Sequence, residues 1–119
     1  MDRAKNKHQV LSLITTVGSQ ADAQRLAQGL LAARLAACVQ VEPGLVSHYR
    51  WQGKGQQEGE LRLTIKSTVR ALPPLLAHLR EHHPYELPQL VWQVLEASPE
   101  YAAWVEVKPA QAGPRLLVR

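Results

Sequence analysis

The sequence predicts one α+β domain in which strands and helices follow the order βαββαβ, with a further helix at the end. Three observations lead to this prediction. Apolar and polar residues alternate over two stretches, which is the period of a half-buried strand. Apolar residues recur every three or four positions over two others, which is the period of an amphipathic helix. The chain has 119 residues, enough to bury one core.

The first strand is predicted over residues 9–17, which are apolar and β-branched toward the end. Gly18 ends it, and Ser19 stands three residues before Asp22, the spacing of a helix-start capping box. Apolar residues then follow at helical spacing: Ala23, Leu26, Ala27, Leu30 and Leu31. The sequence therefore predicts a first helix that runs to about Arg34.

Residues 36–51 predict a long second strand that bends or bulges at Pro43-Gly44. The polar stretch 52–59 contains three glycines and predicts a loop. Residues 60–67 alternate cleanly between apolar and charged or polar side chains. They predict a third strand that pairs with the second as a hairpin.

The second helix is predicted from leucines at helical spacing, at positions 72, 75, 76 and 79. Pro73 and Pro74 fit only its first turn. Pro84 moves His83 out of the helical region, so the helix should end there. Residues 90–95 are apolar on both faces and predict the fourth strand, and the segment Ser98-Pro99-Glu100 predicts the start of a short last helix.

This order is that of a split-βαβ, ferredoxin-like sandwich, whose helices cover one face of the sheet only. The fourth strand is nevertheless apolar on both faces, and the long hairpin carries Tyr49 and Trp51. The open face must therefore be buried against something. Copies of the same chain in a closed ring are the simplest way to cover it.

The net charge of +4 is concentrated at the two ends of the chain. Of 14 basic and 10 acidic residues, six basic residues and one acidic residue lie in 1–8 and 108–119. The body, residues 9–107, keeps eight basic against nine acidic residues and is nearly neutral. We therefore expect a basic N-terminal tail over 1–8, one domain over 9–107 and a basic C-terminal tail over 108–119, with no nucleic-acid partner.

The sequence has no apolar run long enough to cross a membrane and no secretory signal at its start. These features predict a cytoplasmic location without a membrane partner. The one cysteine, Cys38, cannot form an intrachain disulfide, and alone it cannot build a structural zinc site.

Two adjacent histidines, His82 and His83, lie at the predicted helix-to-strand corner. Imidazole is a common ligand for copper, zinc and nickel, so the pair is a candidate metal site. The alternative is a polar helix end that places histidines near the negative pole of the helix dipole. His78 lies four residues before His82, shares its helical face, and offers a second way to chelate one ion.

A second candidate site consists of Lys66, Tyr85, Glu86, Tyr49 and Trp51, which could line a ligand pocket. The alternative is that these residues hold the turn and a subunit interface. Lys66 is expected either to pair with Glu86 or Glu60 or to bind an anionic ligand between subunits. The sequence contains no coherent nucleophile–base pair and no usefully spaced carboxylates, so we do not expect an enzyme.

Several segments together resemble the CutA family of divalent-cation tolerance proteins. They are Leu-Ala-Ala-Cys-Val (35–39), Pro-Gly (43–44), Tyr-Arg-Trp-Gln-Gly-Lys (49–54), Ile-Lys-Ser-Thr (65–68), His-Pro-Tyr-Glu-Leu-Pro (83–88) and the segment 101–104. The resemblance covers about residues 9–107. It implies a tight homotrimer in which long strands pair between subunits, tolerance to divalent cations, and copper(II) binding without an established enzymatic reaction.

The resemblance also implies specific copper ligands, a histidine pair and a cysteine. His82 and His83 match the pair, whereas the cysteine found in some members falls at Thr15, whose hydroxyl is a poor substitute for a thiolate. Cys38 matches a different family cysteine and is expected to be a small packed residue. Either copper binding is then weaker, or histidines of different subunits form the copper site across a trimer interface.

An alternative function comes from the PII signalling trimers, which share this subunit fold. On that hypothesis a small anionic ligand binds in a cleft between subunits, through Lys66 and the hairpin loop. This alternative depends on analogy between folds alone.

Overall fold

The computed structural model describes residues 8–106, so the predicted tails lie outside the described residues except for His8. The elements occur in the predicted order. They are β1 (Gln9–Val17), α1 (Gln20–Ala32), β2 (Cys38–Trp51), β3 (Lys54–Ser67), the 3-10 turn η2 (Val69–Ala71), α2 (Leu72–His82), β4 (Val91–Glu96) and α3 (Pro99–Glu106). His8 is attached to the fold, because its carbonyl accepts a hydrogen bond from the Ala97 N–H at 2.9 Å.

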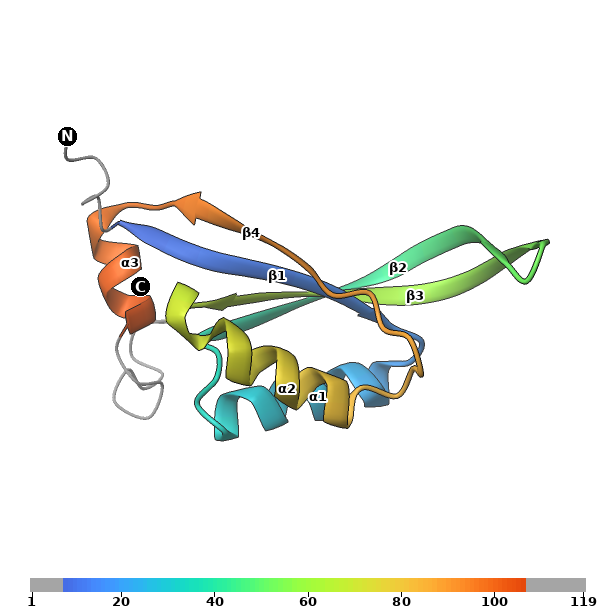
Figure 1. Cartoon of the computed structure of the whole chain (residues 1–119), viewed down its shortest axis with the longest axis horizontal. Coiled ribbons are helices and arrows are strands. Elements are labelled where there is room, and N and C mark those ends of the chain that lie inside the picture. The colour runs from blue at the N-terminus through green and yellow to red at the C-terminus, as the bar shows by residue number, and fades with distance from the viewer. Residues whose placement is uncertain (1–7, 107–119) are drawn as a thin grey trace.

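The four strands form one antiparallel sheet in the order β2-β3-β1-β4. The two inner strands are β3 and β1, and Leu13 of β1 lies opposite Ile65 of β3 on one side and Trp92 of β4 on the other. Helices α1 and α2 lie side by side across one face of this sheet (Figure 1). The predicted α+β class and the predicted one-sided helix layer are therefore confirmed.

The main core lies between the sheet and the two helices. The alternation of β1 and β3 directs one set of apolar side chains toward the helices. Leucines at helical spacing on α1 and α2 pack against them. The fully buried members are Leu11, Leu13, Val17, Ala23, Leu30, Leu63, Ile65, Leu75 and Leu79. Each element of the βαββα portion thus contributes to one continuous cluster.

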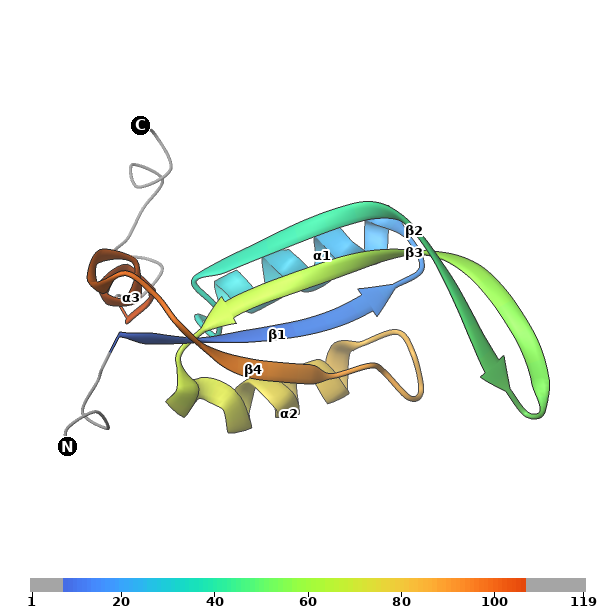
Figure 2. The same ribbon diagram turned by 90° about the horizontal axis from the view of Figure 1, so that it is seen from above.

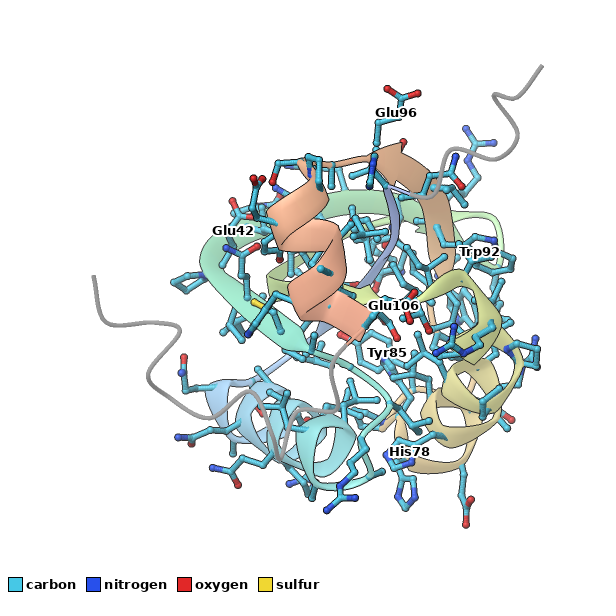
Figure 3. All side chains as sticks on the ribbon, turned by 90° about the vertical axis from the view of Figure 1, so that its left-hand side faces the viewer. Glu42, His78, Tyr85, Trp92, Glu96 and Glu106 are labelled. Atoms are coloured by element: carbon cyan, nitrogen blue, oxygen red, sulfur yellow. The ribbon has the colours of Figure 1, made fainter. Side chains whose placement is uncertain are left out.

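Helix α3 packs on the opposite face, at one end of the sheet. Val10 and Leu95 are register partners of β1 and β4 on that face, and Val10 is buried against Ala102 and Val105 of α3. The helix covers only this end (Figures 1 and 3). Within residues 8–106, no other helix covers the remainder of this open sheet face.

The prediction of a loop over residues 52–59 is wrong. The turn consists only of Gln52 and Gly53, both with positive φ (52° and 80°), as in the tight turns that fit twisted hairpins. Residues 54–59 belong to β3 and pair with β2. Their polar, glycine-rich sequence conceals the strand, because residues 54–59 are exposed in the described part of the chain and apolar alternation is not required there.

The predicted bulge at Pro43-Gly44 is confirmed. Both residues lie opposite the single residue Leu61, between the register pairs Glu42–Arg62 and Leu45–Glu60, and Gly44 has φ 85°. Beyond this bulge the hairpin leaves the sheet as a two-stranded ribbon (Figure 2). The ribbon and the edge strand β4 expose large apolar side chains, among them Trp51 (50% exposed) and Trp92 (45%).

Helix α1 ends at Ala32, two residues before the predicted end. Arg34 has φ 60°, which closes the helix in the left-handed conformation. Within residues 8–106, no helix combines the length and the apolar character needed to cross a bilayer.

Candidate functional site

The corner that follows α2 is formed as the sequence predicts. The helix ends at His82, and His83 is extended (φ −70°, ψ 138°) ahead of Pro84. The two neighbouring histidines consequently have different environments. The side chain of His82 is 52% exposed, whereas His83 is buried at 8% exposure beside β1.

Hydrogen bonds occupy both ring nitrogens of His83. Its Nδ1 accepts the Tyr85 N–H at 3.0 Å, so the proton of the neutral ring is on Nε2. Nε2 lies 2.9 Å from Thr15 Oγ1 and 3.1 Å from the Thr16 carbonyl oxygen, which accepts its hydrogen. Burial lowers the pKa of His83 against the opposing effects of the Thr16 carbonyl, Asp22 and Glu60. A metal ion can reach this ring only by replacing one of these contacts.

Thr15 is the position at which the resemblance places a cysteine ligand. In the structure its side chain contacts His83, which is 68 residues away in the chain. Thr15 lies on β1 and His83 directly follows α2, so the packing of α2 on the sheet brings the two side chains together. A sulfur atom at position 15 would therefore lie beside the imidazole, while the native hydroxyl forms a hydrogen bond with it instead.

His78 and His82 lie together on α2, as their four-residue spacing predicts. Their ring centroids are 4.3 Å apart, and Glu81 Oε1 is 4.0 Å from His82 Nε2. His78 lies on the outer side of the helix layer (Figure 3), where a Cβ atom at Gly29 of α1 would come 3.7 Å from its Nε2. Burial and the neighbouring His82 lower the pKa of His78, which favours the neutral, metal-binding form.

These side chains fit part of a metal site rather than a complete one. Two imidazoles and a nearby carboxylate are donors that copper(II) accepts. Within residues 8–106, however, no three His, Cys, Asp or Glu side chains are grouped to hold an ion. One chain therefore brings two imidazoles together, and a metal ion bound there would need further donors.

Tyr85 belongs to a hydrogen-bonded network that sequence reasoning missed. Its Oη donates to Glu60 Oε2 at 2.6 Å, and Ser47 Oγ donates to Glu60 Oε1 at 2.6 Å. Burial and the Glu60 carboxylate raise the pKa of Tyr85. The clean alternation of residues 60–67 indicated only that Glu60 points away from Leu61; it carried no signal of this partner.

The other predicted ligand-binding residues do not share a pocket in one chain. Lys66 lies opposite Cys38, with its Nζ 3.4 Å from Gln40 Oε1. Tyr49 pairs with Gln56, ten residues from Lys66 on β3. That separation corresponds to about 33 Å along the strand.

Trp51 lies at the ribbon tip and Glu86 is exposed. Glu60, one of the two acids suggested for Lys66, is bound by Tyr85 and Ser47 instead.

Comparison with known proteins connects this arrangement to one family. The family model described as CutA1 divalent ion tolerance protein matches residues 11–108. The chain belongs to the CutA family. It is 40% identical over 94 residues to the divalent-cation tolerance protein CutA of Thermus thermophilus, covering 78% of this chain and 91% of that protein. The CutA of Pectobacterium atrosepticum is 43% identical, with 78% of this chain and 86% of that one covered.

Solved CutA structures have the same fold. The CutA of Synechococcus elongatus superposes with a TM-score of 0.81 at 38% identity, covering 86% of this chain and 91% of that chain. A CutA of Archaeoglobus fulgidus, described as periplasmic, gives a TM-score of 0.78 at 26% identity, over 82% and 95% of the two chains. The chain therefore has the fold of the solved CutA chains.

Proposed function

We propose that this chain is a homotrimeric divalent-cation tolerance protein that binds copper(II) and takes part in the response to metal ions, without an enzymatic reaction. Membership of the CutA family supports the tolerance role. The observation that carries the copper proposal is the His78–His82 pair, with ring centroids 4.3 Å apart at an accessible helix end.

Surface features of the single chain support the trimer. Edge strand β4 exposes Val91, Trp92 and Val94, and an apolar edge that is left unpaired promotes association. The ribbon adds two glycines, Gly55 and Gly59, that face Arg50 and Val46 across the strands. A Cβ atom at Gly55 would meet nothing within 4 Å, so the chain itself does not require a glycine there. Close approach of another subunit would explain it.

The copper ligands follow from accessibility. His82 is the first ligand and His78 completes a chelate with it. His83, the second member of the predicted pair, joins only if a metal ion replaces one of its hydrogen-bond contacts, either the Tyr85 N–H at Nδ1 or the Thr15 and Thr16 contacts at Nε2. A subunit neighbour or water supplies the remaining positions.

Copper(II) titration calorimetry on metal-stripped full-length protein tests this assignment. We expect saturable binding that His82→Ala and His78→Ala each weaken by at least about tenfold, the effect of losing one donor of a chelate. His48→Ala, which removes an exposed ribbon histidine, is the matched control and should bind normally. Binding that survives in the His78→Ala/His82→Ala double variant but disappears in His83→Ala would show that copper binds at the buried His83 ring instead.

Thr15→Cys tests the contact between β1 and His83. A thiolate at this position provides a soft donor beside an imidazole, so we expect copper affinity to rise by about tenfold or more. Thr15→Ser, which keeps the hydroxyl, is the control and should leave the affinity unchanged. Equal affinities in the cysteine and serine variants would show that copper does not approach this position.

We also propose that the protein acts in the cytoplasm. Cysteine usage supports this location: the sequence has one cysteine, Cys38, which is a free thiol, and thiols stay reduced in the cytoplasm. Fractionation of cells that express the full-length protein tests it, and recovery in the periplasmic fraction would contradict it.

A further inference from the structure

A pocket far from the histidine corner combines two arginines with an apolar floor. It has a volume of about 280 Å³ and lies where the α1–β2 connection, the end of β3 and the end of α3 meet. Leu35, Ala37 and Val105 are among its apolar lining residues, and Arg34, Thr68, Arg70 and Glu106 provide its polar rim. None of the ligand candidates from the sequence lies in it.

Hydrogen bonds fix the pocket wall. Ser67 Oγ donates to the Leu35 carbonyl at 2.7 Å, and the Ala37 N–H donates to the Lys66 carbonyl at 2.9 Å. The α1–β2 connection is therefore attached to the end of β3. These bonds hold the segment that forms the pocket wall, so the shape of the wall does not depend on a free loop.

Arg34 occupies a backbone conformation that suits glycine. Its φ is 60°, and the N–H groups of Arg34 and Leu35 bond to the carbonyls of Leu31 and Leu30, both at 3.0 Å, as in a Schellman helix end. An arginine at this place costs free energy that a glycine would not. Within residues 8–106 the Arg34 guanidinium has no acidic partner. Arg34 thus combines an unfavourable backbone conformation with a guanidinium that, among the described residues, is unpaired at the pocket rim.

The charged residues of the pocket rim together carry a net positive charge. Arg70 Nη2 bonds to Glu106 Oε1 at 2.9 Å, which neutralises one of the two guanidinium groups. This ion pair is exposed, with side chains 77% and 49% accessible, and exposed pairs are weak. The remaining N–H groups of Arg70 and the Thr68 hydroxyl, which forms no cap to the following turn, are available to a ligand.

We propose that this pocket binds a small organic oxyanion. Its carboxylate or phosphate group would lie against Arg34 and Arg70, and its carbon skeleton against the apolar floor. Guanidinium groups bind both kinds of oxyanion through paired N–H···O bonds. The site is separate from the proposed copper ligands, so either can fail without the other.

The test is a titration of the full-length protein followed by amide chemical shifts at constant ionic strength. Inorganic phosphate and AMP probe the phosphate group, and succinate probes the carboxylate group. We expect at least one probe to shift the amides of Leu35, Thr68 and Val105 but not that of His82. Absence of saturable shifts at the pocket amides with all three probes would overturn the proposal.

Arg34→Gly is the decisive variant, because glycine suits φ 60° and the fold should be preserved or stabilised. Its affinity for the probe should fall by about tenfold to a hundredfold, the effect of losing a charged hydrogen-bond donor. Glu106→Gln should tighten binding by releasing Arg70. Arg80→Gln removes an exposed charge on α2, which contributes no residue to the pocket lining, and should have little effect. An Arg34→Gly variant that binds as the native protein does, or an equal loss in Arg80→Gln, would overturn the assignment.

Copper titration of Arg34→Gly separates this inference from the proposed function. Its copper affinity should equal that of the native protein, because Arg34 is not among the histidine ligands.

Discussion

His83 shows how a potential metal ligand becomes a structural residue. Its Nδ1 holds the Tyr85 backbone and its Nε2 contacts the end of β1 through Thr15 and Thr16. The ring thus joins the corner after α2 to the inner strand β1. A buried imidazole with both nitrogens bonded stabilises the fold only while it is neutral.

This environment predicts that acid destabilises the protein through His83. The pKa of His83 is lowered in the folded state, so the unfolded chain binds the proton more readily. Stability is then fully present above the unfolded pKa of about 6.5 and is lost as the pH falls through the folded value. Urea unfolding at fixed protein concentration should show a lower midpoint at about pH 5.5 than at about pH 7.5, on either side of the unfolded value.

The control for this prediction is His83→Gln, which removes the titrating group. His78 also has a lowered pKa and contributes in the same direction, so the variant should keep part of the pH dependence and lose the rest. An unchanged pH dependence in His83→Gln would show that His83 is not the group responsible.

At the scale of elements, two glycines have opposite roles. Gly29 lies inside α1, and a Cβ atom there would make ordinary contact, 3.7 Å from His78 Nε2. Gly44 lies in the β2 bulge at φ 85°, with open space around it. The first glycine weakens a helix without a conformational need, whereas the second provides a conformation that other residues adopt only at a cost.

The same substitution should therefore have opposite effects at the two sites. Gly29→Ala should raise the free energy of unfolding by about 0.5–1 kcal/mol through helix propensity. Gly44→Ala should lower it by about 1–2 kcal/mol, because alanine is strained in the left-handed region. Denaturant unfolding at one protomer concentration measures both, since association affects apparent stability. A loss of stability in Gly29→Ala would indicate that α1 is packed more tightly there than in the single chain.

At the scale of the whole molecule, the described residues leave much of one sheet face and the β4 edge uncovered. Helices α1 and α2 cover one face of the sheet, α3 covers one end of the other face, and the ribbon projects away from the sheet (Figures 1 and 2). Trp92 and Val94 remain 45% and 46% exposed on β4. Burial of such side chains contributes on the order of 1–3 kcal/mol each, so an interface that covers β4 would gain considerable stability.

A charge placed on this edge should prevent assembly. We expect light scattering of the native protein to give the mass of a trimer and that of Trp92→Lys to fall toward a monomer. Leu31→Lys is the matched control: Leu31 is 39% exposed and belongs to α1 instead of β4, so the variant should remain trimeric. Trimers in both variants would show that β4 is not at the subunit contact.

Local sequence patterns were sufficient to predict the order of elements, the bulge and the end of α2. Periodicity identifies a helix or a strand because each element buries one face, and Pro43-Gly44 and Pro84 act on the backbone beside them. The same local patterns carried the resemblance to the CutA family. The two histidines at the corner were visible for this reason, as was the helical face shared by His78 and His82.

The accessibility of these side chains, and the groups that surround them, emerged only from the folded arrangement. His83 meets Thr15 across 68 residues, Tyr85 meets Glu60, and Arg34 lies at one pocket with Arg70 and Glu106. Such contacts depend on strand register and on which helix lies over which strand, neither of which leaves a periodic trace in the chain. The outer half of the hairpin was not predicted for a related reason. Backbone hydrogen bonds between the two strands form it, and these bonds do not depend on which side chains are present.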